Sequence, residues 1–445
     1  MKYVKNIFNQ YIIKTYLIAL VYFLFIDYKY FGICSLVVFS IYTLTKIDID
    51  ITFFEDKLLK YSPLIFYTRK LYIGIFQESL WVKTFFDTST PFVDLKSTLI
   101  QLNCQNNQIS LLGDGFKSMT YNCAWGDLRY GPLFHIIKIP FENINFAFFP
   151  IFFYLIFLLI FMKFKNEVDL NEFEINLIAL SPIVNQSLSQ LNIDLIIFAI
   201  FYLTIKRFPK KTFLNLTMFL CLSLLKYHPI GLIFGYILLS GKKKMNQLYG
   251  IFYLIVFISV VYSFSQLDTN FLLNNDTARP SQMFSANGLL TISQYVWINY
   301  FDYSYGFRVV LFILIFQIIL IFATVYFNKE FYSRIIKLTE PQNDFFTFST
   351  LGWILTISIY SNYDYRYIVL LLVLTLLKRN NVTNFIIISL FLLSPIPYVP
   401  IEIFVNVLFI FKAFLFIILT SICFFIFISN KNNILFKKLK NLSNE

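Results

Sequence analysis

The sequence has little charge. Asp, Glu, Lys and Arg together make up 14% of its 445 residues, whereas 58% of the residues are hydrophobic. A soluble domain of this composition would not have enough polar side chains to cover its surface. Apolar runs bounded by Lys and Arg recur along the chain instead, and this pattern is typical of polytopic membrane proteins. We therefore predict an all-α polytopic membrane protein, a single transmembrane domain over residues 1–445 with about 11–13 transmembrane helices.

Several functional signatures are also missing. Two histidines are too few to indicate a metal site, and the chain contains no Walker loop, no dinucleotide-binding glycine pattern and no serine elbow. We expect neither a metal nor a cofactor. The net charge of +12 would suit nucleic acid, but the basic residues form short clusters between apolar runs, where the positive-inside rule puts them. We therefore expect membrane lipids around the protein and no nucleic-acid partner. The first apolar run lacks a small-residue cleavage site, so we expect no cleavable signal. From the repeated apolar runs we expect an integral protein of a bacterial inner (plasma) membrane.

The basic clusters give the predicted orientation. The apolar run 146–162 ends at Lys163 and Lys165, which places that end in the cytoplasm and the long connection 87–145 outside. A second long polar connection, 265–305, falls on the same outer side. The later runs that we expect to cross the membrane are 173–188, 193–205, 212–226, 229–240, 248–264, 307–327, 345–360, 367–377, 383–396 and 403–428.

The start of the chain leaves the number of crossings open. Apolar runs at 11–26 and 31–47 are followed by a stretch of mixed charge, 48–70, and by residues 71–86, which suit a helix lying at the headgroups. The orientation requires either one or three crossings before residue 87.

The connection 87–145 is the predicted catalytic loop. A polar connection of this length between hydrophobic helices is uncommon unless it has a function. Asp94, near its start, is the first candidate for a general base, and Asp127 is the alternative. The loop also contains Cys104 and Cys123. In an oxidising compartment a disulfide between them would stabilise the loop by about 3 kcal/mol, and the alternative is two unpaired thiols.

Polar side chains also occur where membrane depth makes them costly. They form four groups, all expected on the same side as Asp94: Asn192 with Asp194, Lys226 with His228, Arg279, and Asp364 with Arg366. A purely structural explanation remains open for each group. Interfacial carboxylates and cations can simply contact water, a lysine can extend to the headgroups, and Asp364 can pair with Arg366.

Five short motifs resemble a known family. They are Pro91-Phe92-Val93-Asp94-Leu95-Lys96, Asp127-Leu128-Arg129-Tyr130-Gly131-Pro132, Asn192-Ile193-Asp194, Leu225-Lys226-Tyr227-His228-Pro229 and Asn362-Tyr363-Asp364-Tyr365-Arg366. In this order they resemble motifs of the integral-membrane glycosyltransferases of family 87, the polyprenol-phosphate-mannose-dependent α-1,2-mannosyltransferases with the GT-C fold. The chain departs from the family in having Gln190-Leu191 where glycine is usual, in the insertion of His228, and in Gly131 beside Tyr130, so mannose itself is not implied.

The resemblance implies transfer of a sugar from a polyprenyl phosphate to a hydroxyl of a glycan or lipid acceptor on the extracytoplasmic face. Asp94 would be the base, with Asn192, Asp194 and Asp364 as supporting polar residues. The cations expected to stabilise the leaving phosphate are Arg129, Lys226, His228, Arg279 and Arg366. Two alternatives remain: a carrier or flippase for a polyprenyl-linked or other amphipathic substrate, and a polymerase or ligase of surface glycans.

Overall fold

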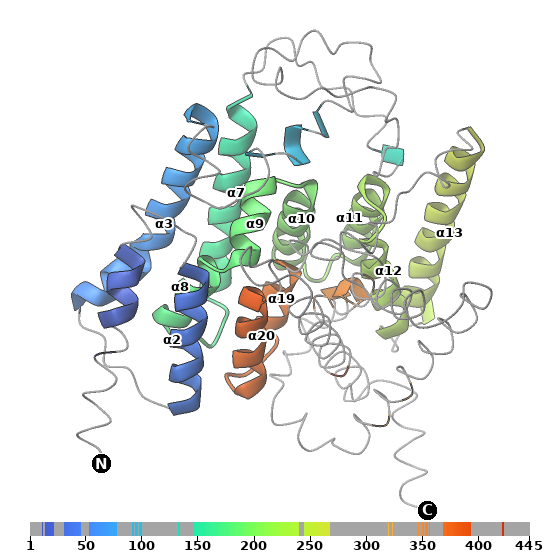
Figure 1. Ribbon diagram of the computed structural model, residues 1–445. Coiled ribbons are helices and arrows are strands. Elements are labelled where there is room, and N and C mark those ends of the chain that lie inside the picture. Colours follow the sequence, from blue (N-terminus) through green and yellow to red (C-terminus); the bar gives the residue numbers. More distant parts are fainter. Residues whose placement is uncertain are drawn as a thin grey trace, which may run out of the picture. The chain divides into compact units, whose positions relative to one another are not determined.

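The fold was analysed in a computed structural model of the full chain (Figure 1). The structure describes residues 11, 14–21, 31–45, 53–77, 91–92, 94–96, 98–99, 132–133, 146–239, 244–267 and 368–392, together with positions 319, 323, 346, 349–350, 352–354, 356 and 421.

The described residues form α-helices and turns, and they contain no β-strand, so the all-α prediction is confirmed for this part of the chain. The helices are α2 (Phe31–Thr45), α3 (Phe53–Phe76), α7 (Phe148–Lys165), α8 (Glu172–Ala179), α9 (Pro182–Gln190), α10 (Ile193–Arg207), α11 (Thr212–Leu225), α12 (Ile230–Leu239), α13 (Lys244–Leu267), α19 (Leu370–Leu374) and α20 (Asn381–Leu392). Most coincide with a predicted apolar run.

The chain divides into two compact units. The first consists of Met1–Thr98, Asn143–Ile196 and Arg379–Val399, and the second of Leu99–Glu142, Ile197–Lys378 and Pro400–Glu445. The boundary after Ile196 falls within α10.

In the first unit, one helix, α3, covers most of the mixed-charge stretch 48–70 and the first part of 71–86, for which a helix at the headgroups is predicted. Residues 53–76 form one helix, which at 1.5 Å per residue is about 36 Å long. The reason is a buried stripe at helical spacing, which a connection in water would not need. The stripe consists of Leu59, Ser62, Pro63, Phe66, Tyr67, Lys70, Ile73 and Gly74. Among the described residues before the long loop, 14–21, α2 and α3 are helical.

The predicted run 173–188 is two helices, α8 and α9, with a break at Ser181 before Pro182. Proline has no backbone N–H and disfavours helix in the residue before it, which explains the break. The hydroxyl of Tyr67 on α3 donates to the carbonyl of Ala179 beside this break. α3 packs against α7 and α8, and α20 packs against α2, α8 and α9.

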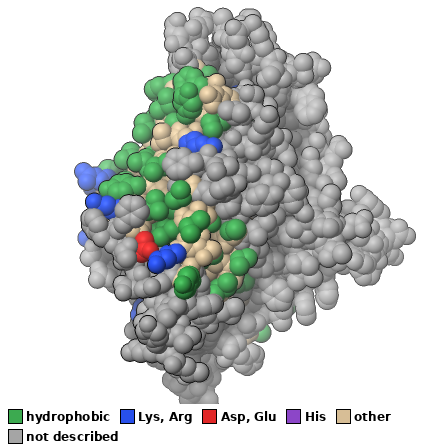
Figure 2. All heavy atoms as spheres, turned by 60° about the vertical axis from the view of Figure 1, so that its left-hand side comes forward, with side chains coloured by type: hydrophobic (Ala, Val, Ile, Leu, Met, Phe, Trp, Pro, Cys, Tyr) green, Lys and Arg blue, Asp and Glu red, His purple; other side chains and the backbone are tan. Residues whose placement is uncertain are grey.

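Apolar side chains are not confined to the interior of the described part of the chain. Along α7 the exposed side chains before Lys163 are all apolar, namely Phe148, Ile151, Phe152, Leu155, Leu159 and Met162. Hydrophobic side chains also cover much of the described surface on the side where α2 and α3 lie (Figure 2). In contrast, Lys70, Glu174 and Asn215 are completely buried.

By length and composition, α7 is the one helix in the described part of the chain that could cross a membrane unaided. The number rises to two if α9 and α10, which are bent by 110° at the break between them, count as a broken span.

In the second unit, α11, α12 and α13 pack against one another. Gly231 and Gly235 of α12 lie directly against the backbone of Gly352. A Cβ atom on Gly231 would overlap the Gly352 carbonyl, and one on Gly352 would lie 2.5 Å from the Gly235 Cα atom. Such small-residue contacts let helices approach closely, and they are common in membrane bundles.

Candidate functional site

The structure brings the predicted base beside the first of its predicted supporting residues. The side-chain amide of Asn192 donates a hydrogen bond to Oδ2 of Asp94, with a donor–acceptor distance of 2.7 Å. The two residues are 98 positions apart in the chain. Asp94 is partly exposed, whereas Asn192 is buried. Two of the motifs selected from the sequence therefore meet at one place.

An aromatic anchor positions the Asp94 segment. Phe92 is completely buried, and its ring lies 6.4 Å, between centroids, from the ring of Phe146 just before α7 and from that of Tyr154 in its second turn. Its backbone N–H donates to the carbonyl of Ser189 at 2.8 Å. Phe92 has a φ of 60°, in the left-handed region that side chains other than glycine adopt at a cost. The packing and this backbone bond together hold that conformation, and Asp94 follows two residues later.

The turn between α9 and α10 presents Asn192. Leu191 ends α9 in the left-handed conformation, with a φ of 48°, and its N–H bonds to the Ser187 carbonyl at 3.0 Å. The Oδ1 atom of Asn192 accepts the N–H of Asp194 at 3.1 Å, so the same side chain caps α10 and holds Asp94. Asp194 lies in the first turn of α10, where a negative charge is favourable. The position of Asp194 therefore favours a role in stabilising the start of α10.

A buried lysine that the sequence analysis missed lies behind this turn. Lys70 of α3 has 0% exposure, and its Nζ atom donates to the backbone carbonyl of Asn185 at 3.0 Å. Nζ also bonds to the Asn185 side-chain oxygen and to the hydroxyl of Ser189. All three acceptors lie on α9, the helix that ends at the Asn192 turn.

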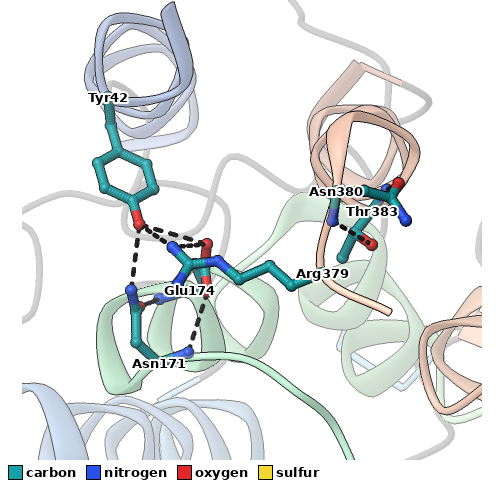
Figure 3. Close-up of polar contacts among 6 residues, drawn as sticks. All are labelled: Tyr42, Asn171, Glu174, Arg379, Asn380 and Thr383. Carbon is teal, nitrogen blue, oxygen red and sulfur yellow. Dashed lines mark hydrogen bonds and ion pairs between the residues drawn. The ribbon is translucent and has the colours of Figure 1, made fainter. Parts of the chain in front are cut away.

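A second polar cluster, also missed, lies at the start of α8 (Figure 3). Glu174 has 0% exposure and forms an ion pair with Arg379 at 3.0 Å. Asn171 and Glu174 make a capping box: Oδ1 of Asn171 accepts the Glu174 N–H at 2.9 Å, and Oε2 of Glu174 accepts the Asn171 N–H at 3.0 Å. The hydroxyl of Tyr42 accepts bonds from Asn171 and Arg379 and lies 3.4 Å from Oε1 of Glu174. This cluster connects α2, α8 and the residues before α20.

The carboxylates of Asp94 and Glu174 lie toward opposite ends of α7. Through Phe92, the Asp94 segment contacts Phe146, just before this helix, and Tyr154 in its second turn. Lys165, its last residue, pairs with Glu172 at 2.5 Å, at the start of α8. Because α7 has 18 residues, its ends are about 27 Å apart.

The predicted cations Lys226 and His228 belong to the second unit, between α11 and α12. Both are buried, at 5% and 8% exposure. The indole N–H of Trp353 donates to Nδ1 of His228 at 2.9 Å, and the two ring planes are 9° apart. Because an indole nitrogen can only donate, Nδ1 of His228 must carry a lone pair, and the neutral ring carries its proton on Nε2. Trp353 is a residue that sequence reasoning did not select.

The remaining predicted site residues lie outside the described part of the chain. They are Asp127, Arg129, Arg279, Asp364 and Arg366, together with the proposed disulfide cysteines Cys104 and Cys123. Among the residues that are described, no group of three or more His, Cys, Asp or Glu side chains could hold a metal ion.

No protein-family model matches the chain, and neither a curated protein nor a solved structure is similar to it. The site must therefore be interpreted from its own geometry.

The missed residues left partial signals in the sequence. Lys70 shares the helical spacing of Leu59, Phe66 and Tyr67, so it falls on the buried stripe of α3. Asn171 and Glu174 have the spacing of a capping box. Arg379 carries no such signal, because it was one member of a basic cluster and its partner lies far away in the chain.

Proposed function

We propose that the protein is an integral-membrane glycosyltransferase that moves a sugar from a polyprenyl phosphate to a hydroxyl of a glycan or lipid acceptor on the extracytoplasmic face of the plasma membrane. In this proposal the chain forms a GT-C-like bundle of about 11–13 transmembrane helices. The observation that carries the proposal is the hydrogen bond between Asn192 and Asp94, which joins two motifs selected for their resemblance to such enzymes.

The placement of polar groups supports a membrane location. Lipid tails favour apolar side chains on the outside of helices, and they force polar side chains to find partners inside the bundle. The exposed apolar face of α7 and the buried, hydrogen-bonded Lys70 and Asn176 fit both requirements. In water, an apolar surface of this extent would favour association or aggregation.

The orientation is supported by the two ends of α7. Lys163 and Lys165 lie at the same end as Arg379, which agrees with a cytoplasmic face rich in basic residues. Asp94 belongs to the other end, which would then be extracytoplasmic. This orientation needs one or three crossings before the loop, and the described residues there include the helical segments 14–21, α2 and α3.

The chemistry assigned to Asp94 is proton removal. As the acceptor oxygen attacks the anomeric carbon, Asp94 takes its proton, a new carbon–oxygen bond forms, and the bond to the donor phosphate breaks. Polyprenyl phosphate leaves with the electron pair of that bond. The Asn192 amide fixes the direction of the carboxylate, and partial exposure leaves Asp94 accessible to a substrate.

The leaving phosphate needs positive charge or hydrogen-bond donors. Lys226, together with Arg129, Arg279 and Arg366, is assigned the first role. His228 is assigned the second, because the neutral ring with its proton on Nε2 is a donor of the kind that a phosphate oxygen accepts.

The test is a transfer assay in membranes that contain the protein. A panel of polyprenyl phosphates with different radiolabelled sugars is supplied, and label is followed into lipid and glycan products. We expect label from one donor to appear in a product that requires the protein. If the labelled donor crosses the membrane with its sugar intact and no product forms, the protein is a carrier. Label in long polymers would instead assign a polymerase or ligase.

A further inference from the structure

Lys70 is a charged group completely enclosed by the protein. A buried ammonium is tolerated only where hydrogen bonds replace its lost water, and its three N–H groups allow three such bonds. The acceptors on α9 are the carbonyl and the side-chain oxygen of Asn185 and the hydroxyl of Ser189. Asn185 lies in the middle of α9 and Ser189 in its last turn, the carbonyl end of the helix, where a positive charge is favourable.

The same turn of α9 holds the Asp94 segment. The carbonyl of Ser189 accepts the N–H of Phe92, and Asn192, three residues beyond Ser189, donates to the Asp94 carboxylate. Thus Ser189 contacts Lys70 through its side chain and Phe92 through its backbone. A shift of this turn would move both attachments of the Asp94 segment together.

We infer that Lys70 is a positioning residue for Asp94: it fixes the last turn of α9, and this turn fixes the segment that carries the carboxylate. The catalytic part of this inference rests on the proposed glycosyl transfer, whereas the mechanical part does not. A displacement of a general base by about 1 Å can lower a rate about 100-fold, so a remote residue of this kind can affect chemistry strongly.

The chain provides a matched control for loss of a buried polar link. Asn176 on α8 is 1% exposed and also attaches to α3, through the carbonyl of Leu59 at 2.5 Å and the hydroxyl of Ser62 at 2.6 Å. It also accepts the Tyr16 hydroxyl at 2.7 Å. Asn176 therefore links α3 to the neighbouring helix without touching the Asp94 segment.

The experiment compares Lys70→Met with Asn176→Leu, since each removes the polar group and keeps the approximate size. Two quantities are measured on the purified full-length protein: hydrogen exchange of the peptide containing residues 91–96, by mass spectrometry, and the steady-state constants for transfer. We expect Lys70→Met to accelerate exchange at the Phe92 amide at least tenfold and to lower kcat by about 10–100-fold, with KM for the donor changed less than about threefold. Asn176→Leu should lower thermal stability but leave both quantities within about threefold of the wild type.

Ser189→Ala is the milder variant if Lys70→Met does not fold, because it removes one acceptor and keeps the lysine. It should change both quantities in the same direction by a smaller factor. Unchanged exchange over residues 91–96 in the folded variant would overturn the inference, as would equal effects from the Lys70 and Asn176 variants. A wild-type protein that transfers no sugar would overturn the proposed function instead, and the exchange result would still decide whether Lys70 holds the segment.

Discussion

The two ends of the first unit each hold a carboxylate bonded to an asparagine, and they differ in access to solvent. Glu174 is completely buried, and its partners Asn171, Tyr42 and Arg379 draw three parts of the chain together. Asp94 is partly exposed and follows a residue in the left-handed conformation, next to a long polar connection. The comparison teaches that a fully enclosed carboxylate with a paired cation serves the fold, whereas an oriented but accessible one is available for chemistry.

The strongest test of this difference is Asp94→Asn. The substituted amide keeps the size and an oxygen that can accept the bond from Asn192, but it cannot take a proton. We expect the rate of sugar transfer to fall about 10²–10⁴-fold, because that is the usual contribution of a positioned general base. The thermal unfolding temperature should stay unchanged, and transfer is measured with the radiolabelled donor.

Asp87→Asn and Asp127→Asn are the controls, since both carboxylates belong to the same connection. If Asp127→Asn abolishes transfer and Asp94→Asn does not, Asp127 is the base. If none of the three substitutions matters and substrate still crosses the membrane, the protein is a carrier.

Asn192→Ala examines how the carboxylate is held. A hydrogen bond to a charged group contributes about 1.5–3 kcal/mol, so its loss should reduce kcat by about 10–150-fold. Ser187→Ala on α9 is the matched control, because it removes a hydroxyl that bonds locally to the Ile183 carbonyl. Equal kcat values for the two variants would show that orientation by Asn192 is unimportant.

Arg379→Met is the complementary change at the enclosed end. It leaves the buried carboxylate of Glu174 without its cation. Because the Arg379 side chain is 44% exposed, we expect a loss of about 1–3 kcal/mol in the free energy of unfolding, below the cost for a fully buried pair. The kcat per folded molecule should remain that of the wild type.

Unfolding is followed by urea titration in detergent, with Lys210→Met as the control that removes an exposed positive charge. A large fall in kcat without a loss of stability would mean that the Glu174 cluster takes part in catalysis.

The sequence predicted those features that depend on local pattern. Apolar runs gave most of the helices, and the motifs around Asp94 and Asn192 identified two residues that lie in contact. Charge clusters also placed Lys165 and Arg379 on one side, which agrees with their positions beside Glu172 and Glu174.

The remaining features depend on contacts between distant residues. Lys70 belongs to a stretch that the sequence marks only as mixed in charge, since Lys57, Lys60 and Arg69 precede it, although its helical spacing puts it on the buried stripe of α3. Its acceptors on α9 are 115 and 119 positions away. The bond from Trp353 to His228 spans 125 positions. The spacing of residues along a helix can indicate that a polar side chain is buried, but it does not identify the distant residue to which that side chain is hydrogen-bonded.

The smallest expected effect is that of Tyr42→Phe, which removes one hydroxyl from the enclosed cluster. That hydroxyl accepts a bond from the Asn171 amide at 3.1 Å and one from Arg379, and it lies 3.4 Å from Oε1 of Glu174. The ion pair and the capping box do not need the hydroxyl, so most of the cluster should persist. We therefore expect a loss of about 0.5–1.5 kcal/mol in the free energy of unfolding, with kcat unchanged.

Tyr16→Phe is the matched comparison, because the Tyr16 hydroxyl donates to Oδ1 of Asn176 at 2.7 Å and the two rings both pack edge-on against Phe173. Losing that donor leaves a buried amide oxygen to be satisfied, so Tyr16→Phe should cost at least as much as Tyr42→Phe. If Tyr42→Phe costs more than Arg379→Met in the same urea titration, the cluster is held together mainly by the tyrosine. The ion pair between Glu174 and Arg379 would then contribute less than the hydrogen bonds of Tyr42. The enclosed end would differ from the Asp94 end in its buried hydrogen bonds and not in its paired charge.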